Sequence, residues 1–370
     1  MKILEEVSLK EKRLFAVMDA NGLDAVLLKR QTNFTWFTGG HYNMVLVADI
    51  VGMNCILITR KGERFLVTNQ VEVPRMEQEE KLPELGFTTL SYPWEENREL
   101  EMIAKVVPDA SRIGCDIPYA GFKEIAKDVQ KCRFSLVDNE IERYDFLGKQ
   151  LSTAAEKVLL GFRPGDSEGD IAGRVARELW KDRIDVVNFM VAGDERVFKY
   201  RHPIVANRLI KKYVMLCCNG RYKGLITTIT RFAHFGKIDP GLYEQYVKNV
   251  EIECRMIAAS RPGTPDGVPV KIAFDSYQEM GFPGEEKLHQ QGGSMGYQPR
   301  DNCPTSKSLD PIQDNQAYCW NPSISGTKSE DGIICTSAGP IFITRPIIFP
   351  TLELETGGIK FSRPDILVID

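Results

Sequence analysis

The chain has 370 residues, of which 43% are hydrophobic and 26% charged, and a mean hydropathy of −0.24, values typical of a folded protein of about two domains. Its 47 basic and 51 acidic residues give a net charge of −4, which argues against a nucleic-acid-binding surface. The charged start, MKILEEVSLKEKR, lacks the apolar core of a signal peptide, and charged or polar residues interrupt every long apolar stretch. We therefore expect neither secretion nor membrane association.

Nine cysteines, an odd number, show none of the short spacings of a disulfide framework. Reduced thiols in a cytoplasmic protein are the simplest interpretation. No CxxC pair or Cys/His cluster indicates a zinc site.

The first third of the chain alternates helical and strand-like patterns. Ser8-Leu9-Lys10-Glu11 has the S-x-x-E form of a capping box and predicts a helix over 8–20, which Asn21-Gly22 would end. Segments 44–59 and 65–68 flank a turn at 60–63 and predict a hairpin. Further predicted elements are strands at 24–28, 112–115 and 134–137 and helices at 96–107 and 122–130. This pattern predicts an α/β domain over residues 1–138.

A second domain is predicted over residues 139–370. A helical pattern at 140–162 ends before Pro164-Gly165, after which Ser167 and Asp170 would cap the next helix. Later predicted elements are strands at 186–192, 213–218, 224–234, 317–321, 332–337 and 340–344 and helices at 241–259 and 268–280. The Pro/Gly-rich segment 298–314 predicts a long ordered loop.

Five short motifs follow one another over about 170 residues of the second domain. They are PGDSEGDI (164–171), Arg201-His202-Pro203, LCCNGRYKGLITTITR (216–231), HQQGGSMG (289–296), and Trp320-Asn321-Pro322 with Ser329-Glu330-Asp331. The series resembles the creatinase, aminopeptidase P and prolidase superfamily, whose motifs include "PG-x-[ST]-E-x-[DE]-[IL]", "hxDxGxxxxGxxxDxTR", "HxxGHGxG" and "xEPG … xED". TNFTWFTGG (32–40) resembles the smaller domain of that family more loosely.

The resemblance implies an α/β (α+β) protein, with a creatinase-like N-terminal domain at 1–138 and a C-terminal "pita-bread" domain at 139–370. That domain has curved antiparallel sheets around a central site. It also implies a homodimer, as is common among two-domain members.

The resemblance also shows which residues should bind metal, and most are replaced. Family members hold two divalent ions with Asp, Asp, His, Glu and Glu, and here Cys218, Thr228, Gly293 and Asn321 stand at the first four positions. Only Glu330 remains, and one carboxylate cannot offset and bridge two divalent ions. We therefore expect no metal and no other cofactor. A lone soft-metal site at Cys218 is a remaining alternative to a small buried residue.

Creatinase itself belongs to this fold and cleaves a C–N bond without metal, using histidine as the proton carrier. By that resemblance His202 is the leading general acid/base, because a neutral imidazole can take a proton from water and return it to a leaving nitrogen. His289 and Glu330 complete the candidate catalytic set. The alternatives are a structural loop histidine at 202, a site-lining role for His289, and an internal Lys328–Glu330 ion pair.

Further residues on or beside the motifs are candidates for substrate binding. They are Arg201, Arg231, Tyr297, Arg300, Trp320, Asn321, Lys328 and, with His41 in the first domain, Trp36 reaching a partner's site. The structural alternatives are an ion pair for Arg231, a surface position for Arg300 and core packing for Trp320 and Trp36.

Three hypotheses for function follow. The first is a metal-independent hydrolase of an amide- or amidine-type C–N bond in a small molecule. The second is a non-catalytic binding protein that has lost the chemistry. The third is an Xaa-Pro peptidase with an atypical metal site. We expect a small-molecule substrate and a homodimer, with no nucleic-acid or membrane partner.

Overall fold

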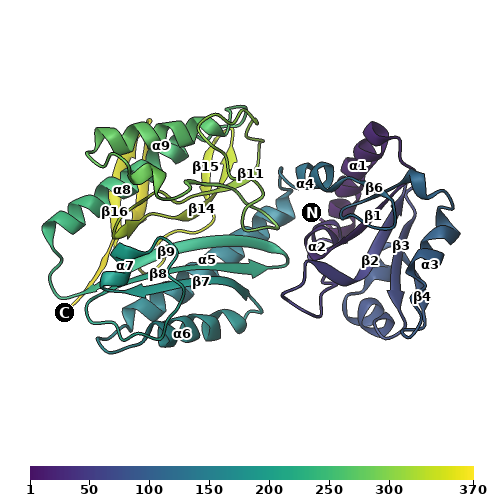
Figure 1. Ribbon diagram of the computed structural model, residues 1–370, viewed down its shortest axis with the longest axis horizontal. Helices are drawn as coiled ribbons and strands as arrows, with labels where there is room; N and C mark the ends of the chain where they lie inside the picture. The colour runs from purple at the N-terminus through teal and green to yellow at the C-terminus, as the bar shows by residue number, and fades with distance from the viewer. The chain divides into compact units, whose positions relative to one another are not determined.

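The computed structural model describes residues 1–370, which form two compact units, Met1–Glu140 and Ile141–Asp370. Each unit has its own sheet and its own helices (Figure 1). None of the helices combines the length and apolarity that crossing a bilayer requires.

The first unit is built on one six-stranded sheet. Its elements are α1 (Ile3–Asn21), β1 (Ala25–Arg30), α2 (Gln31–Phe37), β2 (Val51–Thr59), β3 (Arg64–Asn69), β4 (Phe87–Tyr92), α3 (Glu99–Val106), β5 (Ile113–Cys115), β6 (Lys123–Glu124) and α4 (Ala126–Cys132), with short helical turns η1 (Arg75–Glu79), η2 (Leu82–Leu85) and η3 (Ala110–Arg112). The strand order is β4-β3-β2-β1-β5-β6. Strand β2 pairs antiparallel with β1 and β3, whereas β1–β5, β3–β4 and β5–β6 are parallel.

Two local predictions in this unit are wrong. Helix α1 begins at Ile3, where Lys2 and Glu5 form the reciprocal cap, so Ser8 lies inside the helix. The predicted strand at 134–137 is reduced to a single β-bridge residue, Ser135, whose carbonyl also accepts from Arg13. The hairpin with its turn at 60–63 is confirmed, although its first strand begins at Val51 and not at residue 44, and the left-handed Gly22 (φ 68°) ends α1 as predicted.

The second unit carries one eight-stranded sheet and two small hairpins. Its elements are α5 (Asp138–Leu160, which begins in the first unit), α6 (Glu168–Trp180), β7 (Asp185–Gly193), α7 (Glu195–Lys199), β8 (Tyr213–Tyr222), β9 (Leu225–Phe235), α8 (Pro240–Ala259), α9 (Gly267–Glu279), η4 (Glu285–Lys287), β10 (Gly292–Ser294), β11 (Gln316–Trp320), β12 (Ser323–Ile324), β13 (Thr327–Lys328), β14 (Asp331–Thr336), β15 (Gly339–Phe342), β16 (Thr351–Thr356), β17 (Ile359–Pro364) and β18 (Leu367–Ile369). The sheet order is β10-β11-β14-β9-β8-β7, with β15 beside β14 and β18 beside β9. All pairings are antiparallel except β9–β18.

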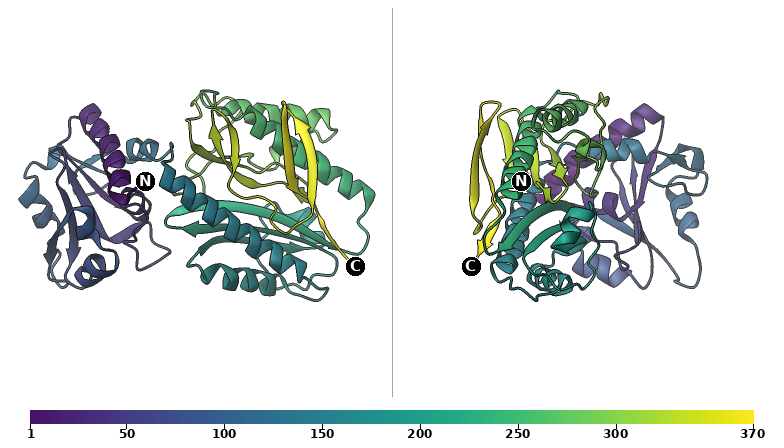
Figure 2. Two further views of the ribbon diagram at one scale, coloured as in Figure 1. Left: turned by 180° about the vertical axis from the view of Figure 1, so that it is seen from behind. Right: turned by 60° about the vertical axis from the view of Figure 1, so that its left-hand side comes forward.

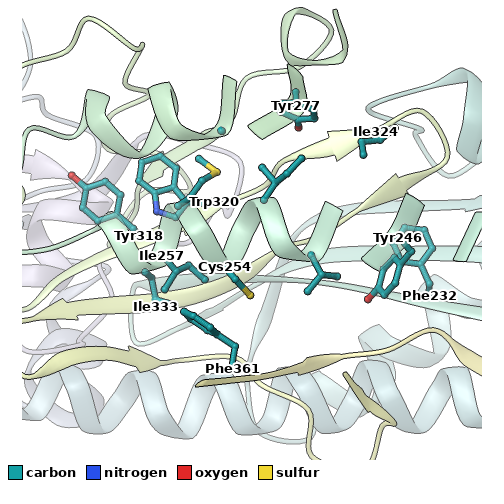
Figure 3. Close-up of a cluster of buried hydrophobic side chains, with 14 of the residues drawn as sticks. Phe232, Tyr246, Cys254, Ile257, Tyr277, Tyr318, Trp320, Ile324, Ile333 and Phe361 are labelled. Carbon is teal, nitrogen blue, oxygen red and sulfur yellow. The ribbon is translucent and has the colours of Figure 1, made fainter. Parts of the chain in front are cut away.

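Helices cover this curved sheet. Helices α5 and α6 lie along β7, β8 and β9, and α8 with α9 lie near β11 and β14 (Figures 1 and 2). The predicted cap of α6 is confirmed, because Asp170 N–H donates to Ser167 Oγ at 3.0 Å and Ser167 N–H donates back to the Asp170 carboxylate at 3.1 Å. The core between α8, α9 and the sheet includes Phe232, Tyr246, Ile257, Trp320 and Phe361 (Figure 3).

Candidate active site

Two histidines from distant loops meet in the second unit. His202 follows α7, and His289 lies between η4 and β10. Their Nε2 atoms are 3.0 Å apart and their ring centroids 4.8 Å apart. His289 is 9% exposed, whereas His202 is exposed at the surface. The two histidines predicted to be catalytic are therefore in direct contact, and one is buried while the other is exposed to solvent.

The loop that carries His202 is fixed at its base by Glu168 of the PGDSEGDI motif. The fully buried Glu168 carboxylate accepts from the backbone N–H of Gly193 at 3.1 Å and of Ala206 at 2.8 Å. Arg196 lies 2.9 Å from the same carboxylate. Charge-assisted hydrogen bonds of this kind are among the stronger ones, so the motif's acidic residue positions the loop rather than the reactants.

Arg201 fixes the tip of the same loop. Its guanidinium donates to the Glu285 carboxylate and, at 3.1 Å, to Ser325 Oγ. Glu285 also accepts from the Ser325 N–H at 2.9 Å. The substrate-binding role predicted for Arg201 is not seen in this arrangement, because the side chain is already paired; it holds His202 in place.

The protonation of the histidine pair follows from its surroundings. His289 Nδ1 is buried and has no hydrogen-bond partner. A bare lone pair there is less costly than an orphaned N–H, so His289 carries its proton on Nε2 and donates to His202 Nε2. Burial, and then the charge of Lys328, lower the pKa of His289 to about 3. Partial burial and Lys328 also lower the pKa of His202.

Glu330 lies between β13 and β14 and is surrounded by donors. Its Oε2 accepts from Lys328 Nζ at 2.7 Å, Thr230 Oγ1 at 2.7 Å and Cys217 Sγ at 3.2 Å. Its Oε1 lies 3.4 Å from both Arg300 Nη2 and Cys319 Sγ. A carboxylate offers about four lone-pair sites, so five neighbouring donors leave it saturated.

The surroundings of Glu330 favour the ionised form of its carboxyl group. Burial alone would raise the pKa of its carboxyl group, but the charges of Lys328 and Arg300 and the hydrogen bonds outweigh burial and lower it. Glu330 hydrogen-bonds to neither histidine, so the internal pair with Lys328 is what the structure shows.

The pairing of β8 with β9 corrects the assignment of one lost ligand. Asn219 lies opposite Thr228, and Cys218 lies opposite Ile229. Directly opposed residues share a face and neighbours alternate, so Cys218 faces away from Thr228 and Glu330. A lone metal site at Cys218 with Glu330 is therefore wrong.

A sequence signal for this register exists. Only three residues separate Gly220 from Gly224, one fewer than in the family pattern. Lys223 and Gly224, at φ 50° and 81°, form the two-residue turn that this shortening requires. The missing residue moves Asn219 to the place opposite Thr228, and neither supplies a carboxylate.

The position of Gly293 cannot accept a histidine. A Cβ atom there would lie 1.9 Å from the carbonyl oxygen of Asn302. Asn321, at the fourth lost position, is 3% exposed and its Oδ1 has no partner. Its backbone N–H donates to the Gln291 carbonyl at 3.0 Å.

The residues therefore do not fit the two-metal centre that the fold family implies. The structure brings together no group of three His, Cys, Asp or Glu side chains suited to a metal ion. The retained carboxylate already binds a lysine, and the His position is blocked by backbone.

Three other predicted substrate contacts are structural. Arg231 is fully buried between Glu156 and Asp331, each at 3.1 Å. Trp320 is fully buried, and its Nε1–H donates to Ser260 Oγ at 2.8 Å within the core of Figure 3. Tyr297 is also fully buried. All three side chains pack in the interior, which corresponds to the structural alternatives of an ion pair for Arg231 and core packing for Trp320.

The proposed partner-facing residues of the first unit differ in exposure. Trp36 is fully buried against Phe37, with Lys10 Nζ 5.7 Å from its ring centroid. It cannot reach a partner's site. His41 is partly exposed, with its Nδ1 3.3 Å from Glu80.

Sequence reasoning missed several residues of the site. Thr230, Cys217 and Cys319 contact Glu330 directly. Thr230 lies in the Thr-Arg motif and its spacing of two from Thr228 signals a shared face. Glu253 of α8 accepts from Ser329 Oγ and, at 3.0 Å, from Asp331 N–H. It thus holds the residues on both sides of Glu330, and no sequence signal pointed to it.

Comparisons with known proteins agree with this fold. Residues 11–146 match the Creatinase/Prolidase N-terminal domain, and residues 147–362 match metallopeptidase family M24. An Xaa-Pro dipeptidase of Pyrococcus horikoshii is 22% identical over 369 residues, covering 93% of this chain and 98% of that protein.

Solved structures give the same result. The Xaa-Pro dipeptidase from Bacillus anthracis superposes with a TM-score of 0.77 at 20% identity, covering 98% of this chain and 100% of that one. The X-Pro aminopeptidase from Thermotoga maritima gives 0.75 at 16% identity, covering 97% and 99%. These matches show a pita-bread fold, and the chain belongs to metallopeptidase family M24, with a creatinase/prolidase N-terminal domain.

Proposed function

We propose that this protein is a metal-independent hydrolase of an amide- or amidine-type C–N bond in a small molecule. The observation that carries the proposal is the 3.0 Å contact between His202 and His289, one exposed and one buried. An imidazole at the site can act as general acid and base near neutral pH. The similarity to proteins named Xaa-Pro dipeptidase supports a hydrolase that acts on a C–N bond.

His202 and His289 have different roles in the proposed proton transfer. His289 Nδ1, which has no partner within the protein, takes the proton of a water molecule as the water oxygen attacks the electrophilic carbon, and because the pKa of His289 is about 3 this ring relays the charge and does not keep it. The Nε2 proton of His289 passes to His202 Nε2, so the positive charge resides on the exposed ring, where water stabilises it. The proton then returns by the same path to the leaving nitrogen as the C–N bond breaks. The net change is the addition of one water across that bond.

Other polar residues position the two histidines or offer contacts to the substrate. Arg201, Glu285 and Glu168 keep the His202 loop in position. Asn321, whose Oδ1 is free, offers a contact for an uncharged polar group of the substrate. Glu330 holds Lys328 in place, and the charge of Lys328 lowers the pKa of both histidines.

The test is turnover by chelator-treated protein. A panel of amides, amidines, ureas and Xaa-Pro dipeptides would be screened for release of amine or ammonia. We expect a substrate to be found and His202→Ala to lower kcat by about 10²–10⁴-fold. The control is Lys271→Ala, which removes an exposed side chain of α9 that pairs with Asp275 and should leave kcat unchanged. Full activity of His202→Ala would contradict the mechanism.

A second candidate is a non-catalytic binding protein. The saturated Glu330 favours it, because all five contacts of this carboxylate are internal. Ligand binding without turnover of any compound in the panel would support this candidate over the first.

A third candidate is an Xaa-Pro peptidase with an atypical metal. The names of the relatives favour it, whereas the blocked Gly293 position and the Lys328–Glu330 pair oppose it. Dipeptide hydrolysis that is lost on chelation and restored by manganese would establish it.

We also propose a cytoplasmic homodimer. All nine cysteines are free thiols, which suits a reducing compartment. The first unit exposes an apolar run at Val45, Leu46, Val47, Ile50, Val51 and Met53, and such runs commonly mark protein contacts. Light scattering after gel filtration should give a dimer, and Leu46→Ser should weaken it. A monomeric wild-type protein would contradict this proposal.

A further inference from the structure

Asp194 lies where the chain leaves β7 for the segment 195–210, which carries His202. Its backbone has φ 50° and ψ −123°, a conformation that glycine adopts freely and that strains other residues. Asp194 also directly precedes α7, where an aspartate ordinarily accepts from an N–H group of the helix, but its side chain makes no such bond. Asp194 thus departs from two local preferences, and the contacts of its carboxylate show why.

The Asp194 carboxylate binds the chain where it returns from this segment to β8. Its Oδ2 accepts from the Lys211 N–H at 2.8 Å, and its Oδ1 accepts from the Lys212 and Tyr213 N–H groups at 2.9 and 3.1 Å. The Asp194 N–H donates in turn to the Tyr213 carbonyl at 2.7 Å. Hydrogen bonds to an ionised carboxylate are among the stronger ones, so this residue joins the start of the segment to its end.

The contact between the two histidines depends on the place of this segment. His202 and His289 come from separate parts of the chain, and their Nε2 atoms are 3.0 Å apart. A hydrogen bond weakens steeply as its distance and angle change, so a displacement of about 1 Å would break this contact. Arg201 and Glu168 hold the segment at its tip and near its middle, and Asp194 joins its ends.

We infer that Asp194 is a positioning residue of the candidate active site, which fixes His202 against His289 by joining the two ends of the segment that carries His202. The strained backbone persists because three N–H groups hold the carboxylate. The carboxylate contacts backbone amides and takes no part in the proton transfer. The catalytic meaning of this role rests on the proposed function, but the position of His202 can be measured without turnover.

The test compares Asp194→Gly with the wild-type protein by NMR. Glycine adopts a positive φ without strain, so this variant loses the carboxylate while the backbone conformation at residue 194 remains accessible. Exchange of the amide protons of residues 211–213 should become faster by at least about ten-fold. Burial and then Lys328 lower the pKa of His202, against the opposing charge of Glu330, so release of the segment into solvent should raise that pKa towards its ordinary value.

The matched control is Lys81→Gly, which also replaces a residue at φ 50° but lies in the first unit. It should change neither the amide exchange at 211–213 nor the titration of His202. Asp194→Asn keeps the acceptor for two of the three amides, should show a smaller effect, and replaces Asp194→Gly if that variant does not fold.

Faster amide exchange with an unchanged titration of His202 would mean that Asp194 stabilises the fold only, and would overturn the inference. A shifted titration of His202 in a protein that turns over no compound would count against the proposed hydrolase and leave the positioning role standing.

Discussion

Lys328 Nζ lies 2.7 Å from Glu330 Oε2, with both side chains almost completely buried. The lysine thus occupies the oxygen that would otherwise be available to a metal ion. Its charge also reaches the histidine pair, where it helps to lower the pKa of both rings. One ion pair therefore links the loss of the metal ligands to the neutral state of the histidines.

Removing Lys328 should change the titration of His289. Burial is the first cause of the low pKa of His289, about 3, and Lys328 is the second. In Lys328→Met the repulsion disappears, so the pKa of His289 should rise towards its ordinary value. Ring nitrogen NMR over a pH series measures this directly. Lys29→Met, in the other unit, should give no change, and an unchanged pKa in Lys328→Met would refute the electrostatic link.

The buried histidine should make the protein less stable in acid. The pKa of His289 is about 3 in the folded protein and about 6.5 when unfolded. Between these values the unfolded chain binds more protons, so this contribution to the free energy of unfolding is complete above about pH 6.5 and is lost as the pH falls towards 3. Urea unfolding at about pH 7 and about pH 4.5 should show this loss. His289→Gln should show a smaller loss, and an identical loss would contradict the assignment.

The arginine network behind the site should be essential for stability. Arg363 is fully buried and pairs with Glu253 at 2.5 Å and Asp331 at 3.1 Å. Arg363→Met leaves two carboxylates facing each other in the interior and should cost about 3–5 kcal/mol of unfolding free energy. Arg345→Met, which breaks a largely exposed pair with Asp145, should cost less than about 1 kcal/mol. Equal effects in denaturant titrations would argue against a buried network.

A side chain at Gly293 should not be tolerated. Its Cβ would lie 1.9 Å from the Asn302 carbonyl oxygen, so Gly293→Ala must displace backbone and should lower the unfolding temperature. At Gly173 in α6 an added Cβ would have no atom within 4 Å, and Gly173→Ala should stabilise by about 0.5–1 kcal/mol. A stable Gly293→Ala protein would reopen the possibility of a ligand at that position.

Much of the fold is predictable because local rules and the motif series agree. The Ser167 cap, the break at Pro164-Gly165 and the helix at 140–162 all depend on neighbouring residues, and the structure confirms them within two residues. The meeting of His202 with His289 was predictable only through the motifs, since loops from different parts of the chain supply the two rings.

The remaining details of the site depend on strand register. Cys217, Thr230 and Cys319 converge on Glu330 only once β8, β9, β11 and β14 are paired. The turn before Gly224 is one residue shorter than in the family motif, so Cys218 lies on the opposite face of the sheet from Thr228. Matching the motif residue by residue did not take this shortening into account. Arg231 and Trp320 lie on motifs yet pack inward, because a motif position does not determine which way a side chain points.

A crystal structure of the protein grown with manganese, with anomalous data collected for the metal, would decide whether this site works without an ion. We predict no anomalous peak beside Glu330, with Lys328 on the carboxylate and the Nε2 atoms of His202 and His289 in contact. A manganese ion bound to Glu330, with Lys328 displaced, would contradict the metal-free site and restore a metallopeptidase mechanism.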